Sequence, residues 1–280
     1  MSKEKFTFID LFAGCGGLSE GFLSSSFFEG LAHVEWELPM VSTLRDRLEK
    51  KWKHTEEEAF KRVVHFDIQK TKELINGSWD KETKEVYRET NHDDFVLGGL
   101  KKIINNKKVD FIIGGPPCQA YSIAGRAQDK NSMKDDYRNF LFESFVKVVE
   151  EFQPKAFVFE NVPGMLSAEP GGVKVTERVF EAFEKIGYII SKPDELKNRV
   201  YVANDFGVPQ KRRRLIIVGI KKGTSTNLAE LYKKIDSQKE EKKSTVKDIL
   251  ENLPKILPLN SSKRIDGKNI SHTTLGNKEK

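Results

Sequence analysis

The chain has 280 residues, 38% of them hydrophobic, which is enough for one large α/β domain or for one domain with an appendage. Its two cysteines form no disulfide framework, and no stretch has the apolar length of a signal peptide or a membrane span, so we expect a cytoplasmic protein with no membrane partner. The net charge of +6 suits a polyanionic partner but does not form a basic tail.

The first predicted strand, residues 6–12, runs into a glycine turn that opens a helix. Glycines at such a turn let a ligand approach the backbone and leave helix amides pointing at it. A dinucleotide fingerprint that starts at Gly14 would need glycine where Ser19 stands. The turn is therefore better suited to a nucleoside without a pyrophosphate, such as S-adenosylmethionine, although a glycine turn can also merely connect two elements.

Two further predicted strands end in carboxylates. The strand at residues 31–36 ends in Glu35-Trp36, and the strand at residues 63–66 is followed by Asp67. Glu35 can accept hydrogen bonds from ribose hydroxyls, the Trp36 indole can stack on adenine, and Asp67 can accept from the adenine amine. The alternatives are an exposed Glu, a half-buried Trp and an Asp that caps a helix. An amphipathic helix is predicted at residues 38–53, and residues 71–108 are predicted to be a polar surface excursion with one helix.

The fourth predicted strand, residues 109–113, stops at Gly114-Gly115-Pro116-Pro117 and is followed by Cys118. A thiol at the carboxyl end of a parallel strand lies where open α/β sheets bind their ligands, so Cys118 is a candidate nucleophile. A buried structural cysteine is the alternative. The polar segment that follows, up to Lys134, is predicted to be a mobile loop, and a helix is predicted at residues 140–152.

The fifth predicted strand, residues 156–159, is wholly apolar, as is typical of the middle of a parallel sheet. It ends in Glu160-Asn161, which would open into the same crevice as Cys118. A helix is predicted at residues 173–186.

Four cations, residues 211–214, precede a last strand at residues 215–219 and form either a phosphate-binding patch or a solvated basic turn. Arg212 and Arg214 alternate, so at a strand start they would share one face. The remaining chain is predicted to be loosely packed, with one helix at residues 246–252.

These motifs, in this order, resemble those of the cytosine-5 DNA methyltransferases over roughly residues 6–220. The resemblance implies an α/β fold with a doubly wound, mostly parallel sheet, the Rossmann-like fold of S-adenosylmethionine-dependent methyltransferases. The matching blocks are Asp10-Leu-Phe-Ala-Gly-Cys-Gly-Gly17, Glu35-Trp36, Asp67-Ile68, Gly115-Pro-Pro-Cys-Gln119, Glu160-Asn-Val162 and Gln210-Lys-Arg-Arg-Arg214.

The resemblance also implies the catalytic roles. Cys118, as a thiolate, would add to carbon 6 of cytosine, and Glu160 would bond the ring nitrogen at position 3 and the exocyclic amine and supply a proton. Asn161 would orient the surrounding loop. Arg214 would bond the cytosine carbonyl oxygen, and Arg212 would bind the phosphate or the nucleophile loop. Because a stacked base is inaccessible, the cytosine must be flipped out of the duplex.

For the cofactor S-adenosylmethionine and for DNA, the resemblance implies two further sets of residues, and we expect no metal ion. The cofactor set is Phe12, Cys15, Gly17, Leu18, Glu35, Trp36, Asp67, Ile68, Pro116 and Leu141. The set expected to contact double-stranded DNA is Gln119, Ser122, Arg126, Lys211 and Arg213.

One feature departs from the family pattern. The sequence contains no Arg-x-Leu-Thr block and no Gly-Asn-x-Val-Pro block, the motifs that normally follow a target-recognition region. We therefore expect residues 1–220 to be the catalytic and cofactor-binding domain and residues 221–280 to begin the target-recognition region. The chain is then a truncated product or the catalytic subunit of a two-chain enzyme whose second polypeptide carries the missing motifs.

The function expected from these residues is methylation of carbon 5 of a flipped-out cytosine in duplex DNA through a covalent Cys118 adduct. One alternative is methylation of cytosine in RNA, a reaction of one branch of the family. The other is a non-catalytic module that binds nucleic acid or a partner, against which the presence of Cys118, Glu160 and the arginines argues. The target sequence cannot be deduced, because the region that reads base edges is not in the chain.

Overall fold

The computed structural model describes residues 4–117, 141–251, 253, 256–265 and 268–274. Within these residues the chain divides into two units. The first contains the residues up to Tyr201 together with Arg213–Ser237, and the second contains Val202–Arg212 and the residues from Gln238 onward. In the described part of the chain, no helix is long and apolar enough to cross a bilayer.

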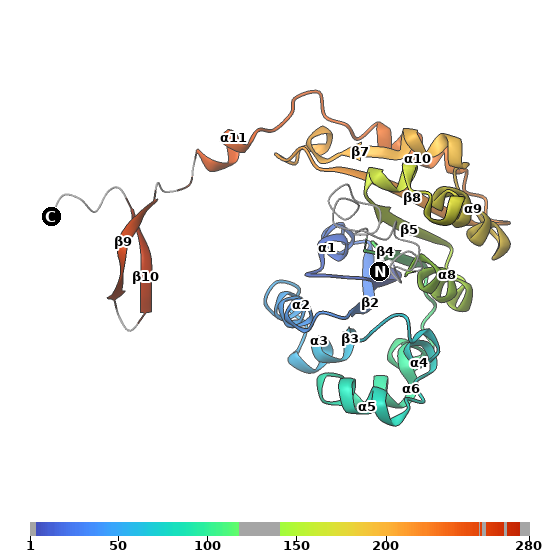
Figure 1. The fold of residues 1–280 in the computed structure, drawn as a ribbon, viewed down its shortest axis with the longest axis horizontal. Helices are drawn as coiled ribbons and strands as arrows, with labels where there is room; N and C mark the ends of the chain where they lie inside the picture. Colours follow the sequence, from blue (N-terminus) through green and yellow to red (C-terminus); the bar gives the residue numbers. More distant parts are fainter. Residues whose placement is uncertain (1–3, 118–140, 252, 254–255, 266–267, 275–280) are drawn as a thin grey trace. The chain divides into compact units, whose positions relative to one another are not determined.

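The first unit is built on a mixed sheet with the strand order β3-β2-β1-β4-β5-β8-β6, and β7 also pairs with β8 (Figure 1). Strands β1 to β5 run parallel, as predicted, whereas β8 is antiparallel to both β5 and β6. The strands are β1 (Phe6–Leu11), β2 (Phe28–Glu35), β3 (Val63–His65), β4 (Phe111–Gly114), β5 (Ala156–Asn161), β6 (Tyr188–Ile189), β7 (Val200–Val202) and β8 (Arg213–Lys221). The mostly parallel sheet predicted from the sequence is therefore confirmed.

Helices cover both faces of this sheet, with α1 and α2 on one side and α8 and α9 on the other (Figure 1). Local sequence explains where several begin: Pro39 lies in the first turn of α2, and Thr55 and Glu58 form a capping box at α3. The α-helices of this unit are α1 (Gly17–Ser24), α2 (Leu38–Lys50), α3 (Glu56–Arg62), α4 (Thr71–Asn76), α5 (Lys81–Tyr87), α6 (Asp93–Ile104), α8 (Leu141–Phe152), α9 (Val175–Lys185) and α10 (Leu228–Asp236). Its 3-10 helices are η1 (Arg88–Thr90), η3 (Pro163–Ser167), η4 (Pro170–Gly172) and η5 (Pro193–Arg199).

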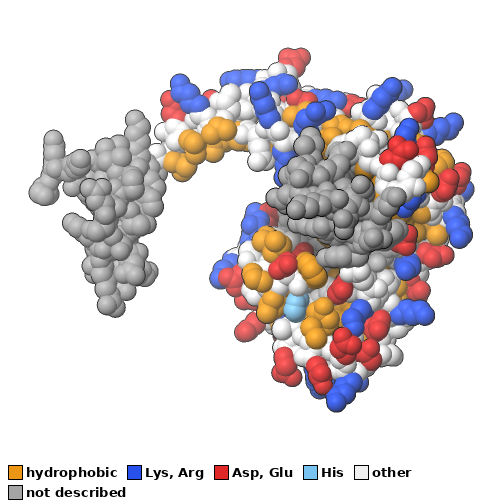
Figure 2. Space-filling model, in the orientation of Figure 1, with side chains coloured by type: hydrophobic (Ala, Val, Ile, Leu, Met, Phe, Trp, Pro, Cys, Tyr) orange, Lys and Arg blue, Asp and Glu red, His pale blue; other side chains and the backbone are white. Residues whose placement is uncertain are grey.

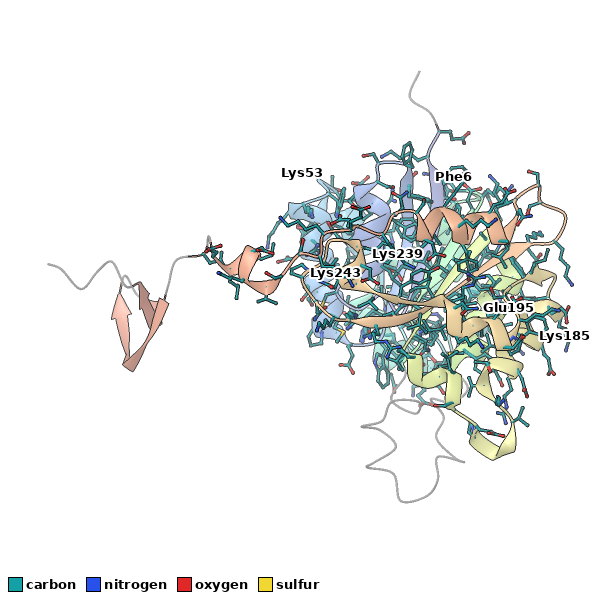
Figure 3. The ribbon with its side chains drawn as sticks, turned by 90° about the horizontal axis from the view of Figure 1, so that it is seen from above. Phe6, Lys53, Lys185, Glu195, Lys239 and Lys243 are labelled. Carbon is teal, nitrogen blue, oxygen red and sulfur yellow. The ribbon has the colours of Figure 1, made fainter. Side chains whose placement is uncertain are left out.

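The core contains the apolar face predicted for α8. Leu141, Phe145, Val148 and Val149 are all buried, and the Phe145 ring meets the Phe159 ring of β5 edge to face at 5.3 Å. Lys185 in α9 and Glu195 in η5 are exposed at the surface (Figure 3). The helical period of apolar residues thus correctly identified the side of α8 that faces the sheet.

The segment at residues 71–108 is not the surface excursion that its composition predicts. It forms α4, α5, η1 and α6, and it buries Leu74, Trp79 and Phe95 in the main core. The Trp79 ring stacks on Phe66 with 4.9 Å between the ring centroids. The prediction was wrong because a few large apolar side chains, separated by charged ones, provide the buried surface.

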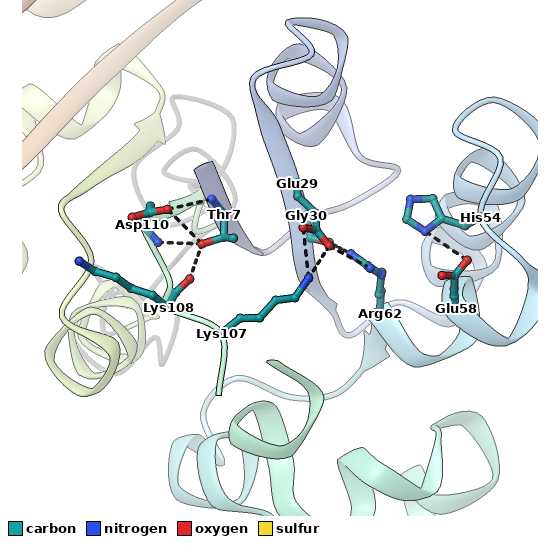
Figure 4. A network of polar contacts seen from close by, with 9 residues as sticks. All are labelled: Thr7, Glu29, Gly30, His54, Glu58, Arg62, Lys107, Lys108 and Asp110. Atoms are coloured by element: carbon teal, nitrogen blue, oxygen red, sulfur yellow. Dashed lines mark hydrogen bonds and ion pairs between the residues drawn. The ribbon is translucent and has the colours of Figure 1, made fainter. Parts of the chain in front are cut away.

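The amino ends of the strands are joined by polar contacts (Figure 4). The Thr7 backbone N–H donates to Oδ2 of Asp110 at 3.1 Å, and the Asp110 N–H donates to Oγ1 of Thr7, also at 3.1 Å. Glu29 in β2 forms ion pairs with Arg62 at 3.1 Å and with Lys107 at 3.0 Å. These contacts fix the end of the sheet opposite to the carboxyl ends, where ligands of open α/β sheets bind.

The second unit contains η6 (Ala203–Phe206), α11 (Val246–Leu250) and an antiparallel hairpin of β9 (Ile256–Ile265) and β10 (Lys268–Thr274). An ion pair of 2.8 Å between Lys243 and Asp205 joins its two chain segments, and Lys243 is labelled in Figure 3. Val246, Ile249 and Leu250 are more than half exposed, and apolar side chains of α11 are visible in Figure 2. The helix was predicted from the sequence, but the hairpin was not.

Candidate active site

Gly114 ends β4 and Gly115 begins the turn that follows, and both are in close contact with the neighbouring strands. A Cβ atom on Gly114 would lie 2.3 Å from the backbone oxygen of Leu11, and one on Gly115 would lie 2.7 Å from Oε2 of Glu160. Because both distances are shorter than van der Waals contact, a larger residue would push β4 from β1 or displace the Glu160 carboxylate. The two glycines therefore bring the end of β4 against the carboxyl group at the end of β5.

Asn161 connects the same turn to β5. Its side chain is buried, with 2% exposed, and its Nδ2 donates to the Pro116 carbonyl oxygen at 3.4 Å. Its Oδ1 accepts from the Val162 backbone N–H at 2.8 Å. The amide thus restrains the backbone two residues before Cys118, which is compatible with the orienting role expected for Asn161.

Glu160 forms an ion pair with Arg214 across β5 and β8. In the antiparallel register Glu160 lies opposite Ile216, and Arg214 is two residues from Ile216, so Glu160 and Arg214 lie on the same face of the sheet. Nε of Arg214 lies 2.5 Å from Oε1 of Glu160, and the two side chains are 25% and 22% exposed. The guanidinium therefore fixes a carboxylate that a ligand can still reach.

The remaining residues predicted to take part in catalysis or DNA binding either lie outside the described part of the chain or are exposed. Cys118, Gln119, Ser122 and Arg126 lie outside the described residues, so their roles stay predictions. Lys211, Arg212 and Arg213 are exposed. Because β8 begins at Arg213, the alternation that predicts a shared face for Arg212 and Arg214 does not reach Arg212, whose carbonyl oxygen accepts from the Ala203 N–H at 2.8 Å.

A cavity of about 390 Å³ opens at the carboxyl ends of β1, β2 and β3, and its volume is in the usual range of small-molecule pockets. Gly115 lines this cavity and also lies against the Glu160 carboxylate, so the cavity and the ion pair share one backbone segment. The cavity is lined by Phe12, Gly14, Val34, Glu35, Trp36, Glu37, Met40, Phe66, Asp67, Ile68, Gln69, Gly115, Pro117 and Leu141.

Most residues predicted to bind the cofactor line this cavity. They are Phe12, Glu35, Trp36, Asp67, Ile68 and Leu141. The predicted residues Cys15, Gly17, Leu18 and Pro116 are not among the lining residues. Cys15 is exposed in the glycine turn, Gly17 and Leu18 begin α1, and Pro116 is buried. Most lining residues that the prediction missed are sequence neighbours of predicted ones, but Met40 enters from the first turn of α2, which no motif marks.

The Glu35 carboxylate is held by backbone amides. Its Oε2 accepts from the Gly14 N–H at 2.7 Å, and its Oε1 accepts from the N–H groups of Trp36 and Glu37 at 2.8 and 2.9 Å. A carboxylate offers about four lone-pair positions, so Oε2 keeps one for a ligand hydroxyl. Glu35 therefore joins the glycine turn to the end of β2 and still presents an acceptor to the cavity.

Asp67 lies at the cavity and does not cap a helix, since the N-cap of α4 is Lys70. Its side chain lines the cavity, and its Oδ1 also accepts from the Gln69 backbone N–H at 2.9 Å. The carboxylate thus closes a local turn while it faces the space where a ligand would lie.

A buried hydrogen-bonded chain lies behind the glycine turn. Oγ of Ser19 lies 2.5 Å from Oδ2 of Asp10 and 2.8 Å from Nδ1 of His33, and none of the three residues is more than 1% exposed. Burial raises the pKa of Asp10 to about 7 and lowers the pKa of His33 to about 3. Through this chain β1, α1 and β2 hold the two ends of the glycine turn.

Together, the strand order, the helices on both faces and the cavity at the carboxyl ends define an α/β methyltransferase fold. The description of the family whose model matches residues 6–78 and 64–280 is C-5 cytosine-specific DNA methylase. The chain belongs to this family.

Relatives and a solved structure agree with this assignment. The chain is 35% identical to the type II methyltransferase M.Bpa9945I of Bacillus paralicheniformis, over 89% of this chain and 61% of the relative. It is 32% identical to the type II methyltransferase M1.HphI of Haemophilus parahaemolyticus, over 96% of this chain and 58% of the relative. A crystal structure of a protein described as a DNA modification methyltransferase encoded within an E. coli prophage matches with a TM-score of 0.62 and 26% identity, over 92% of this chain and 58% of that one. The chain thus spans about three fifths of the length of these relatives.

The opposed pKa shifts of Asp10 and His33 predict how stability depends on pH. Folded Asp10 keeps its proton up to about pH 7 whereas an unfolded Asp loses it near pH 3.8, so this residue makes stability fall as the pH rises between those values. Folded His33 stays neutral down to about pH 3 whereas an unfolded His gains a proton near pH 6.5, so His33 makes stability rise with pH over much of the same range. The two effects oppose each other in the wild-type chain.

We therefore expect Asp10→Asn to steepen the loss of stability on acidification from pH 6.5 to pH 4, because the variant keeps only the His33 effect. The measurement is the free energy of unfolding from urea titrations at several pH values, for the wild-type chain and the variant. An unchanged slope would show that Asp10 does not keep a proton in the folded protein.

Proposed function

We propose that the chain transfers a methyl group from S-adenosylmethionine to carbon 5 of a flipped-out cytosine in duplex DNA. The observation that supports this most is the position of Gly115, which lines the cavity and lies against the Glu160 carboxylate that Arg214 holds. A cofactor in the cavity and a base at Glu160 would therefore be neighbours. Membership of the C-5 cytosine-specific DNA methylase family gives the reaction type.

The proposed chemistry begins at the turn after β4. Cys118, as a thiolate, forms a bond to carbon 6 of cytosine, and the electrons of the 5,6 double bond then make carbon 5 nucleophilic. When the base enters, the Glu160 carboxylate takes up a proton from solvent and leaves its ion pair with Arg214. The protonated Glu160 then donates this proton to the ring nitrogen at position 3, which makes the addition feasible, and Arg214 bonds the carbonyl oxygen of the base. After carbon 5 has gained the methyl group, it passes its proton to solvent and the 5,6 double bond re-forms. The proton at ring position 3 returns to Glu160, and Cys118 leaves as a thiolate.

The residues that line the cavity fit S-adenosylmethionine. Phe12, Trp36 and Phe66 provide aromatic walls, and the carboxylates of Glu35 and Asp67 provide acceptors for ribose hydroxyls and an adenine amine. Bound there, the cofactor would supply the methyl group as an electrophile. The residues of the chain bind it, orient it and exclude water from it.

Two sets of residues are proposed to contact the DNA backbone. The first is the exposed cations Lys211, Arg212 and Arg213, and the second is Gln119, Ser122 and Arg126 of the segment after Cys118. Methylation of RNA is less favoured, because the matching family is one of DNA methylases and the relatives compared are type II methyltransferases.

Removing the proton of Glu160 tests the proposed acid. Glu160→Gln keeps the shape and some hydrogen bonding but cannot donate the same proton, so we expect turnover to fall about 100-fold or more. Binding of S-adenosylmethionine should change little. The measurement is transfer of labelled methyl groups to duplex DNA, and Glu181→Gln on the exposed side of α9 is the matched control. Turnover near the wild-type rate would assign Glu160 a structural role only.

We propose that residues 221–280 begin the target-recognition region and that methylation also needs the terminal motifs, which these residues do not contain. We expect the isolated chain to bind duplex DNA weakly, without sequence preference and with strong salt dependence, because its contacts are to phosphates. Methylation should be low alone and should rise when a polypeptide with a recognition region and the terminal motifs is added. Robust, sequence-specific methylation by residues 1–280 alone would contradict this expectation.

A further inference from the structure

Trp36 presents half of its side chain to solvent, with 51% exposed, and it lines the cavity just beyond the end of β2. Stacking on a purine costs less ordering of the chain if the backbone of such an indole is already held. Two contacts hold it: the Trp36 N–H donates to Oε1 of Glu35 at 2.8 Å, and the Trp36 carbonyl oxygen lies 2.9 Å from Nε2 of His65.

His65 is the last residue of β3 and lies opposite Glu35 in the parallel ladder. Its backbone is bracketed by the buried side chain of Asn91, which accepts from the His65 N–H at 2.9 Å and donates to the His65 carbonyl oxygen at 2.7 Å. The imidazole meets the Tyr87 ring edge to face at 5.3 Å. The segment around η1 therefore fixes where the His65 ring can lie.

The partners of the ring also determine which nitrogen carries the proton. A carbonyl oxygen only accepts, so the contact with Trp36 requires a proton on Nε2. Burial lowers the pKa of His65, which keeps the ring neutral near pH 7 and leaves Nδ1 without a proton. The Thr90 hydroxyl has one proton and two acceptors within reach: Nδ1 at 2.8 Å and the Tyr87 carbonyl oxygen at 3.1 Å. In the Nε2–H form this proton goes to Nδ1, the nearer of the two. The neutral Nε2–H form therefore satisfies both ring contacts.

We propose that His65 is a positioning residue of the cavity, which holds the Trp36 backbone so that the indole faces the adenine ring of the cofactor. This inference rests on the proposed function, since it takes the ligand of the cavity to be S-adenosylmethionine. His65 does not line the cavity and acts only through Trp36.

The first test compares two substitutions by calorimetric titration of the chain with S-adenosylmethionine. His65→Leu removes the donor, and we expect the dissociation constant to rise roughly 3- to 10-fold, the usual worth of one such hydrogen bond. His65→Gln keeps an N–H donor at similar reach and should restore most of the affinity. The matched control is His54→Leu, which removes another partly buried histidine whose side chain is near Glu58 and does not line the cavity.

A double-mutant cycle separates positioning from a general structural effect. If His65 acts through the indole, His65→Leu should have almost no further effect in a Trp36→Ala background. Equal losses in both backgrounds, or wild-type affinity in His65→Leu, would overturn the inference. Absence of binding by the wild-type chain itself would instead overturn the proposed function, and this inference with it.

Nitrogen-15 NMR of the wild-type chain gives a result that does not depend on the folding of any variant. Selectively labelled His65 should show a protonated Nε2 and an unprotonated Nδ1 at pH 7. A proton on Nδ1 alone would leave two acceptors facing each other at Trp36 and would overturn the proposal.

Discussion

The Glu160–Arg214 ion pair depends on three strands that meet at one edge of the sheet. β5 carries the carboxylate, antiparallel β8 brings the guanidinium to the same face, and Gly115, just after β4, leaves room for the carboxylate. A carboxylate that is held before a base arrives needs little reorganisation during the reaction. The same edge also contains the turn that leads to the predicted nucleophile.

Groups around the cavity are also fixed before a ligand binds, and here backbone amides hold one of them. Three amide groups fix Glu35, and the buried chain from Asp10 through Ser19 to His33 fixes the glycine turn from behind. These contacts come from β1, α1 and β2, so the strands and the first helix themselves hold the groups that surround the cavity. A ligand that binds in the cavity therefore spends no binding energy on ordering Glu35 or the glycine turn. The site is preorganised in this sense.

Much of this arrangement could be predicted, because ligands of open α/β sheets bind at the carboxyl ends of the strands. Polar residues that follow an apolar strand in the sequence therefore indicate the site. Glu35 is the last residue of β2, Glu160 is the last but one of β5, and Asp67 follows the end of β3 by two residues, so the rule correctly located all three at the carboxyl edge. Contacts between distant segments have no local signature, so the sequence did not indicate that Trp79 joins the core, that β8 is antiparallel or that Asn91 holds His65. The roles proposed for Cys118 and the residues after it depend on the resemblance alone.

Covalent trapping tests the central claim most directly. In duplex DNA with 5-fluorocytosine in place of cytosine, carbon 5 cannot lose fluorine as it loses a proton, so the adduct should persist. We predict that the chain, with S-adenosylmethionine and any complementing polypeptide, gives a protein–DNA complex stable to denaturation, and that Cys118→Ser gives none. Equal amounts of the complex from both proteins would contradict the account, since the nucleophile would then lie elsewhere.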